Sequence, residues 1–302
     1  MCDRWSALRS AAVKSQLLEM EPMSRHTTFR VGGPADLFVE IASGEELAAM
    51  RKICQESGMD FRILGRGSNM LVGDLGYRGV VFHMGDAFSG IALEGHVLTA
   101  EAGVSLATLA RFARDHSLSG LEFAAGIPGS LGGALVMNAG AYGGEMKDVV
   151  LEIRIMDPEG NLRWISAEEA EMTYRHTRLM EEDWVAMGAR MELTPGDQEA
   201  ITATMSDLAE RRRSKQPLEY PSAGSTFKRP AGYFAGKLIQ DAGLAGYTVG
   251  GACVSEKHCG FVINKDHATA ADVLQVCKDV ADEVKRQTGV EMELEVRLLG
   301  DF

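Results

Sequence analysis

The sequence lacks an excess of positive charge. It has 31 lysines and arginines against 43 aspartates and glutamates, so its formal net charge is −12. Proteins that bind nucleic acid without sequence preference use clustered cations to displace the counterions of the phosphate backbone. We therefore expect no nucleic-acid partner, whereas a small anionic ligand needs only a local group of positive side chains.

A long apolar run is also missing. No stretch approaches the roughly 20 apolar residues of a membrane-spanning helix, and the N-terminal stretch MCDRWSALRSAAVKSQLLEM has no continuous apolar segment of signal-peptide length. We therefore expect a cytosolic protein without a membrane partner.

Paired cysteines are absent as well. The five cysteines are odd in number, widely spread and never arranged as CxxC, which favours reduced thiols in a reducing compartment. The His258–Cys259 pair near Cys253 invites comparison with a metal site, but its spacing matches no common zinc pattern, so no metal is expected. The cysteines are Cys2, Cys54, Cys253, Cys259 and Cys277.

What the sequence does contain is a mixture of helical and strand patterns, which defines an α+β class. A chain of 302 residues exceeds one compact core, so two or three domains are expected, with a boundary at Pro195-Gly196. The predicted helices cover 43–58, 105–117, 197–213, 233–242 and 270–287. The predicted strands cover 36–41, 61–64, 80–82, 97–100, 151–157, 184–193 and 290–298.

Several of these elements carry clear local signals. Ser43 and Glu46 predict a capping box at the start of one helix, and Thr269 is the expected N-cap of the last helix. Alternation in the last strand predicts one apolar and one polar face. The apolar face contains Val290, Met292, Leu294, Val296 and Leu298; the polar face contains Glu291, Glu293, Glu295 and Arg297.

The first glycine-rich segment, LGRGSNM (64–70), directly follows a predicted strand. Met70 stands where a dinucleotide-binding fingerprint has its third glycine, and the glycines that follow exclude the required helix. A tight turn of backbone N–H groups, with Ser68 and Asn69 as further donors, suits an anion and most naturally a pyrophosphate. A plain glycine turn explains the segment equally well.

The second segment, GIPGSLGGALVMNAGAYGGE (126–145), is rich in glycine and other small residues. Such a segment lets another backbone or a flat ligand approach closely, although a bent edge strand or a barrel corner would have a similar composition. Together, the two segments favour a large nucleotide cofactor with a phosphate end and a ring end.

The stretch PSAGSTFKRP (221–230) contains an isolated serine, Ser225. The sequence around it is neither the GxSxG of a nucleophile elbow nor a Walker phosphate loop. A capping or turn serine is the simplest interpretation of these ten residues alone.

Seven segments closely resemble the UDP-N-acetylenolpyruvoylglucosamine reductases, the MurB family. The resemblance follows the order of the family over nearly the whole chain, from about residue 20 onward, and places the chain in the branch that lacks an extra tyrosine-bearing loop. The segments are VGGPAD (31–36), LGRGSNMLV (64–72), IPGSLGGALVMNAGAYGGE (127–145), YRHTRL (174–179), KQPLEYPSAGSTFKRP (215–230), SEKHCGFVIN (255–264) and LEVRLLG (294–300).

The resemblance implies a two-subdomain FAD-binding module of the PCMH type, followed by a C-terminal α+β substrate-binding domain. The implied limits are 1–90 and 91–196 for the subdomains and 197–302 for the substrate domain, whose last strand can return to the flavin site. The implied reaction has two halves: NADPH reduces non-covalently bound FAD, and reduced FAD then reduces UDP-N-acetylglucosamine enolpyruvate to UDP-N-acetylmuramate. A monomer is expected.

The family's catalytic residues correspond to Arg175, Ser225 and Glu295. Hydride addition builds negative charge on the substrate carboxylate, which a guanidinium such as that of Arg175 can bind in bidentate fashion. The resemblance makes Ser225 the proton donor to C2, with Lys228 and Arg229 as candidates to lower its pKa, and it gives Glu295 a role in positioning the substrate carboxylate.

The resemblance also implies binding residues. Arg229 departs from the family, since many relatives have an asparagine there, and its contribution is therefore open. The implied substrate ligands are Tyr174, Lys215, Lys228 and Arg229. The implied cofactor ligands are Gly65, Arg66, Gly67, Ser68, Asn69, Ile127, Pro128, Gly129, Ser130, Gly132, Gly133, Asn138, Ala139 and Gly140.

Two other functions fit part of these observations. A flavin oxidase of the same FAD-binding superfamily would use oxygen and a small alcohol or sugar, but neither glycine segment offers the His or Cys that often holds flavin covalently in such oxidases. A non-catalytic flavin or nucleotide-sugar binding protein would not need Arg175, Ser225 and Glu295 together.

Overall fold

The computed structural model describes residues 4–302, and these fold into two compact units built from interleaved segments. Unit 1 consists of 4–18, 37–66 and 79–211, and unit 2 consists of 19–36, 67–78 and 212–302. The chain passes from one unit to the other within β1, β2, β5 and α5 and in the loop after β3. The three domains expected from the sequence, divided after residues 90 and 196, stay a prediction.

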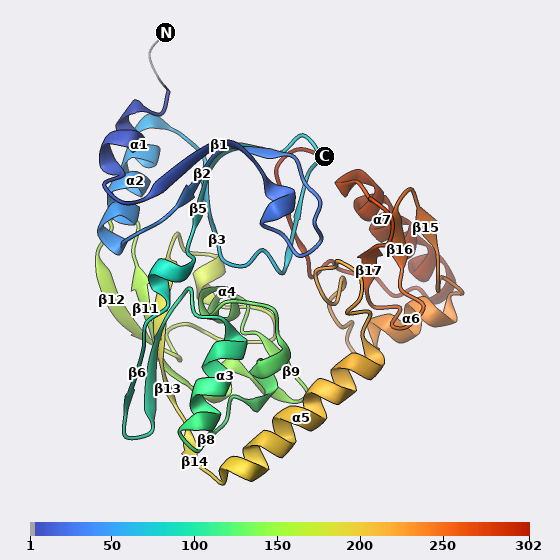
Figure 1. Ribbon diagram of the computed structural model, residues 1–302. Coiled ribbons are helices and arrows are strands. Elements are labelled where there is room, and N and C mark those ends of the chain that lie inside the picture. Colours follow the sequence, from blue (N-terminus) through green and yellow to red (C-terminus); the bar gives the residue numbers. More distant parts are fainter. Residues whose placement is uncertain (1–3) are drawn as a thin grey trace. The chain divides into compact units, whose positions relative to one another are not determined.

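Unit 1 contains two sheets, each covered by helices (Figure 1). The four-stranded sheet has the order β1-β2-β5-β3, and α1 and α2 pack on it through a core that includes Leu8, Leu47 and Phe82. These elements are β1 (Gln16–Pro22), β2 (Pro34–Glu40), β3 (Phe61–Leu64), β5 (Tyr77–His83), α1 (Ser6–Ala11) and α2 (Gly44–Ser57).

The five-stranded sheet of unit 1 has the order β12-β11-β13-β7-β6, with antiparallel neighbours throughout. Helices α3 and α4 pack on it through a core that includes Leu109, Leu135 and Ile153. These elements are β6 (Ile91–Glu94), β7 (Val97–Glu101), β11 (Val150–Met156), β12 (Leu162–Ser166), β13 (Val185–Glu192), α3 (Leu106–Asp115) and α4 (Leu131–Val136). Two small ribbons pair β8 (Leu118–Ser119) with β14 (Thr194–Pro195) and β9 (Gly140–Ala141) with β10 (Gly144–Glu145).

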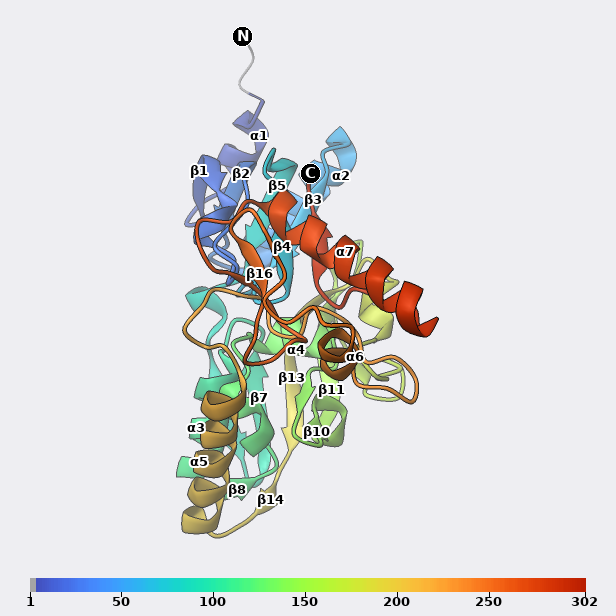
Figure 2. The ribbon, with the colours of Figure 1, turned by 90° about the vertical axis from the view of Figure 1, so that its right-hand side faces the viewer.

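Unit 2 contains the three-stranded sheet β15-β16-β17, against which α7 packs (Figure 2). Val273, Val276, Val280 and Val284 of α7 are fully buried, as the helical period predicted. The elements are β15 (Thr248–Val249), β16 (Ala252–Val254), β17 (Val262–Asn264), α6 (Ala235–Asp241) and α7 (Ala270–Thr288). A separate parallel pair joins β4 (Met70–Val72) to β18 (Arg297–Leu299), and α5 (Gln198–Lys215) contributes its last residues to this unit.

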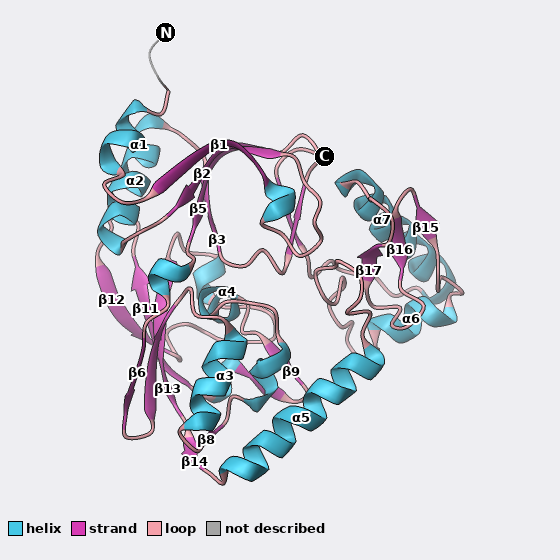
Figure 3. Ribbon diagram, in the orientation of Figure 1, coloured by secondary structure: helices cyan, strands magenta, loops and turns pink. Residues whose placement is uncertain are grey.

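The mixture of helices and strands confirms the α+β class (Figure 3). Thr269 caps α7 as expected, and its hydroxyl accepts a hydrogen bond from the Asp272 N–H. The capping box expected at α2 is only half correct. Ser43 accepts from the Glu46 N–H, but the Glu46 carboxylate accepts from the N–H groups of Lys14 and Ser15.

The strand predicted over 290–298 is wrong in extent. Only Arg297–Leu299 forms a strand, and Leu294 makes an isolated bridge to Phe227. A bend at Val296 shifts the alternation, so Leu298 is 45% exposed while Leu299 is buried. The second glycine segment also differs from expectation, because residues 131–136 within it form α4.

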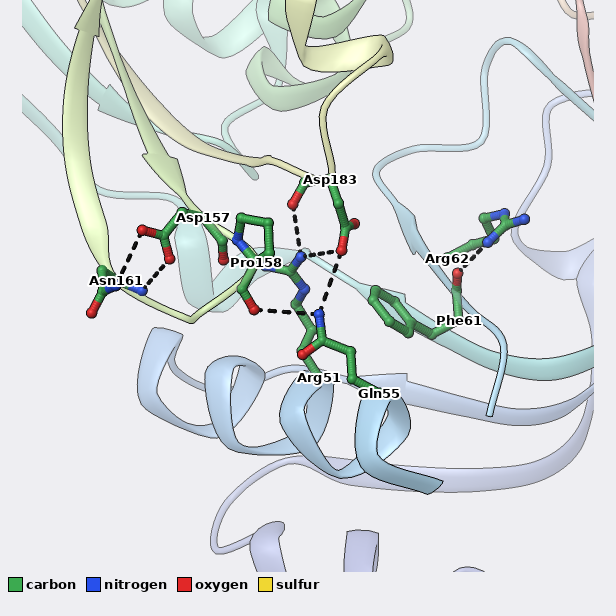
Figure 4. A network of polar contacts seen from close by, with 8 residues as sticks. All are labelled: Arg51, Gln55, Phe61, Arg62, Asp157, Pro158, Asn161 and Asp183. Carbon is green, nitrogen blue, oxygen red and sulfur yellow. Dashed lines mark hydrogen bonds and ion pairs between the residues drawn. The ribbon is translucent and has the colours of Figure 1, made fainter. Parts of the chain in front are cut away.

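Arg51 of α2 ties the two sheets of unit 1 together from a buried position (Figure 4). Its Nη1 donates to the backbone oxygen of Asp157 at 2.9 Å, and its Nη2 donates to the backbone oxygen of Asp183 at 2.8 Å. The Asp183 carboxylate lies 2.9 Å from the same Nη2, and the guanidinium lies 5.6 Å from the centre of the Phe61 ring. The planar guanidinium can satisfy all these partners at once.

Within 4–302, no helix has the length and apolar character needed to span a membrane.

Candidate functional site

The first glycine segment turns so tightly that its glycines cannot carry side chains. Gly67 has a φ of +59°, and a Cβ built on it would lie 1.9 Å from the backbone oxygen of His26. The Gly67 oxygen accepts a hydrogen bond from the Thr28 N–H at 3.2 Å. The turn is therefore packed directly against the 26–28 backbone within unit 2, while Gly65 and Arg66 precede it in unit 1.

The two glycine segments meet within unit 1. A Cβ built on Gly65 would lie 2.4 Å from the Oγ of Ser130, a residue that is itself 2% exposed. A Cβ on Gly133 would meet only that Oγ, at 3.9 Å, so this exposed position is open on its other sides. Small residues thus let the two segments approach each other closely, and the exposed backbone at Gly133 leaves room for a flat ligand.

Backbone hydrogen bonds fix the start of the second segment. The Gly129 oxygen accepts from the Leu106 N–H at 3.0 Å, and the N–H groups of Leu131 and Gly132 donate to Val104 and Ala102, each at 2.8 Å. A Cβ on Gly132 would lie 3.0 Å from the Ala102 Cβ. Ile127 is half-buried and Pro128 is exposed. The segment is therefore held by the turn between β7 and α3 and by the first residue of α3.

Asn138 joins the end of this segment to the loop that carries Arg175. It is fully buried, and its Nδ2 donates to the backbone oxygen of Thr173 at 2.9 Å and to the Glu145 carboxylate at 2.7 Å. Its Oδ1 accepts from the Lys147 N–H at 3.0 Å. The side-chain amide is thus occupied inside the protein, and Ala139 and Gly140 follow it half-buried.

Arg175 is held in an unusual backbone conformation. Its φ is +55°, and that of Asn138 is +40°, a region that residues with a side chain seldom adopt and that clusters at functional sites. One Nη of Arg175 donates to the backbone oxygen of Gly140 at 3.1 Å, and the guanidinium lies 5.0 Å from the centre of the Tyr174 ring. Tyr174 is 49% exposed. The structure thus brings Tyr174, Arg175 and the second glycine segment together in unit 1.

Ser225 and Glu295 lie on adjacent segments of unit 2. Ser225 is exposed, and Gly224 before it has a φ of +77°. The next residue, Thr226, is buried; its backbone oxygen accepts from the Glu295 N–H at 2.9 Å, and its hydroxyl accepts from the Val262 N–H at 2.9 Å. The predicted carboxylate ligand, Glu295, is thus hydrogen-bonded to Thr226, the residue that follows the predicted proton donor, Ser225.

The predicted substrate cations of unit 2 have partners of their own. The Lys228 ammonium forms an ion pair with Glu293. The Arg229 guanidinium lies 3.9 Å from the centre of the Phe234 ring, and its Nε donates to the Tyr233 oxygen at 3.1 Å. These contacts supply no direct link from either cation to Ser225. Lys215 is exposed at the end of α5.

Two further residues beside Ser225 are not among the site residues predicted from the sequence. One is Thr226, described above. The other is His258, whose Nδ1 accepts from the Gly260 N–H at 3.1 Å, while the Gly260 oxygen accepts from the Thr226 N–H at 2.9 Å. Burial lowers the pKa of His258, which favours the neutral imidazole, and the neutral ring carries its proton on Nε2 because Nδ1 accepts the Gly260 hydrogen bond.

Two family models match the chain. Residues 35–166 match the FAD binding domain, and residues 216–299 match the C-terminal domain of UDP-N-acetylenolpyruvoylglucosamine reductase. Together with the meeting of the two glycine segments, these matches define the class: the chain is a flavoprotein with an FAD-binding module and a C-terminal α+β domain. They confirm the predicted fold and the predicted cofactor.

Relatives narrow this class to one family. UDP-N-acetylenolpyruvoylglucosamine reductase of Agathobacter rectalis is 51% identical over 300 residues, which cover 95% of this chain and 95% of that protein. The protein of the same name from Caldanaerobacter subterraneus subsp. tengcongensis is 47% identical over 97% of both chains. The crystal structure of the reductase from Thermus caldophilus matches with a TM-score of 0.81 and 32% identity, covering 95% of this chain and 99% of that chain. The chain belongs to the UDP-N-acetylenolpyruvoylglucosamine reductase family, as the resemblance of its motifs predicted.

Proposed function

We propose that this protein catalyses the NADPH-dependent reduction of UDP-N-acetylglucosamine enolpyruvate to UDP-N-acetylmuramate, a step in peptidoglycan precursor synthesis. The observation that carries this proposal is the match to reductases of that name over 95% of the chain, at 51% identity. The meeting of Gly65 with Ser130 supports the same conclusion, because it joins the two segments predicted to hold the cofactor. The two glycine segments would hold FAD, and the bound cofactor would supply the transfer of a hydride from NADPH to C3 of the enolpyruvyl group.

The protein must stabilise the negative charge that develops on the substrate carboxylate and deliver a proton to C2. Arg175 suits the first task, since its guanidinium is permanently charged and is oriented by the Gly140 oxygen. Ser225 suits the second, because it is exposed and follows a left-handed glycine that presents its hydroxyl. Glu295 orients the carboxylate. These three roles are proposals that rest on the family pattern and on the local geometry of each residue.

The nucleotide-sugar part of the substrate carries a pyrophosphate, and exposed cations are its natural ligands. Lys215 fits this role without rearrangement, whereas Lys228 would exchange its ion pair with Glu293 for a phosphate oxygen. Tyr174 offers an exposed ring beside Arg175. With these ligands we expect a cytosolic, monomeric enzyme that uses no nucleic-acid or membrane partner. No observation favours the oxidase or the non-catalytic binding protein over the reductase.

The test is a pair of half-reactions on the purified protein with FAD bound. NADPH should bleach the flavin absorbance, and UDP-N-acetylglucosamine enolpyruvate should then restore it within seconds under argon. A small alcohol in place of NADPH, with oxygen as acceptor, is the control for the oxidase. Flavin that is bleached by NADPH but is not reoxidised by this substrate would contradict the proposal.

A further inference from the structure

The side chain of Asn69 binds the backbone of Glu295. Its Nδ2 donates to the Glu295 backbone oxygen at 3.1 Å, and its own backbone oxygen accepts from the Arg297 N–H at 3.0 Å. All three residues lie in unit 2, where the parallel pair of β4 and β18 begins at Met70 and Arg297. Asn69 therefore lies at the start of the strand pairing that anchors the segment after Glu295.

The peptide groups of Glu295 are held from both sides. Its N–H donates to the Thr226 oxygen at 2.9 Å, and its oxygen receives the Asn69 amide. Residues 290–296 form no strand of their own apart from the bridge at Leu294. The Glu295 N–H is thus held by the bridge between Leu294 and Phe227, and the Glu295 backbone oxygen is held by the side chain of Asn69.

We infer that Asn69 is a positioning residue for Glu295, and that the glycine segment predicted to bind the cofactor also sets the geometry of the substrate half-reaction. This inference rests on the proposed role of Glu295. The sequence predicted Asn69 only as a cofactor ligand. A cofactor ligand and a positioning residue differ in what they control: the first sets FAD affinity and both half-reactions, and the second sets the substrate half-reaction alone.

The loss of one hydrogen bond at this point leaves Glu295 free to shift, and a displacement of about 1 Å costs up to roughly 100-fold in rate. For Asn69→Ala we expect reoxidation by UDP-N-acetylglucosamine enolpyruvate to slow about 10-fold or more. With the protein saturated with FAD, so that a lost contact between Asn69 and the cofactor limits neither half-reaction, the rate of flavin reduction by NADPH should change by less than about 3-fold. Asn69→Asp, which keeps the shape but places a carboxylate oxygen against the Glu295 oxygen, should slow reoxidation at least as much as Asn69→Ala.

Asn264→Ala is the matched structural control. Asn264 also bridges two backbone segments of unit 2, because its Nδ2 donates to the Phe29 oxygen at 3.1 Å and its Oδ1 accepts from the Ala268 N–H at 2.9 Å. Its substitution should lower the melting temperature by a similar amount and leave the ratio of the two half-reaction rates unchanged.

A double-mutant cycle with Glu295→Gln completes the test. If Asn69 acts through Glu295, adding Asn69→Ala to Glu295→Gln should slow reoxidation by less than about 2-fold more. The inference would be overturned if the two substitutions slowed reoxidation by factors that multiply in the double variant. It would also be overturned if Asn69→Ala alone slowed both half-reactions equally. If Glu295→Gln reoxidises slowly while Asn69→Ala reoxidises at the normal rate, the inference is overturned and the proposed function stays intact. A Glu295→Gln enzyme that reoxidises at the normal rate would remove the proposed role of Glu295 and the inference with it.

Discussion

Replacing Gly67 by alanine tests the cofactor segment most directly. An alanine at a φ of +59° is strained by about 1–2 kcal/mol. The new Cβ would also lie 1.9 Å from the His26 oxygen and 3.0 Å from the Thr27 Cα, so the backbone must open by roughly 1 Å. Overpacking of this kind adds about 1–3 kcal/mol. We expect the apoprotein to lose about 2–5 kcal/mol in total.

The opened turn should also bind FAD more weakly. If two backbone N–H groups no longer reach the pyrophosphate, the lost charge-assisted hydrogen bonds amount to about 3 kcal/mol, which is roughly a 100-fold higher dissociation constant. Melting of the apoprotein and titration with FAD, followed by quenching of flavin fluorescence, measure the two effects separately.

Gly58 is the matched control for this variant. It has nearly the same backbone conformation, with a φ of +65°, but a Cβ built on it meets nothing within 4 Å. Gly58→Ala should therefore lose only the strain of about 1–2 kcal/mol and keep its FAD affinity. Equal losses of stability in the two variants would refute the clash at His26, and unchanged FAD affinity in Gly67→Ala would refute the role of this turn in cofactor binding.

Three other predictions concern separate parts of the molecule. Arg51→Met leaves the Asp157 and Asp183 backbone oxygens without their donor, so the melting temperature should fall by about 6–10 °C, for a loss of about 3 kcal/mol; a shift below about 2 °C would show that solvent replaces these bonds. Ser225→Ala should slow flavin reoxidation by the substrate about 100-fold or more and leave reduction by NADPH unchanged in stopped-flow traces; equal slowing of both would assign the serine a structural role. Because burial lowers the pKa of His258 below its usual 6.5, the unfolded chain binds a proton at a higher pH than the folded chain. Stability should therefore be full above about pH 6.5 and fall as the pH drops through the folded pKa, and His258→Gln should flatten this part of the melting profile.

Capping residues and hydrophobic periodicity predicted those elements that are specified within one segment of the sequence. The long helix α7 has an N-cap and a period of buried valines that lie within one segment of the sequence, and both are present in the structure. The last strand failed because its pairing depends on distant residues. Only Arg297–Leu299 forms a strand, which pairs with β4, while Leu294 makes a single bridge to Phe227. The bend at Val296 reverses which side chains are buried. Helix α4 was missed because glycine is a poor helix former, and contacts with Ala102 and Val104 stabilise it.

The site divides in the same way. Glycine spacing predicted two segments that bind one large cofactor. The structure brings these segments into contact at Gly65 and Ser130, and the individual cofactor contacts stay a prediction. The hydrogen-bond partners of the side-chain amides could not be predicted from the sequence. No neighbouring residue indicates that Asn138 binds the Thr173 oxygen or that Asn69 binds the Glu295 oxygen. An asparagine in a glycine-rich loop has the same local signature whether it faces a ligand or the protein interior.

The interleaving of the two units has a consequence for biosynthesis. The core of unit 2 combines Phe29, Val31 and Leu71 with Val273 and Val280 of α7, so its first strands leave the ribosome long before their partners exist. The apolar side chains of these early segments therefore stay exposed until α7 has been synthesised. Conversely, a fragment of residues 212–302 would lack part of its own core. We therefore expect unit 2 to complete its folding only after α7 has left the ribosome, and the protein to depend on chaperones more than a chain whose domains fold in sequence order.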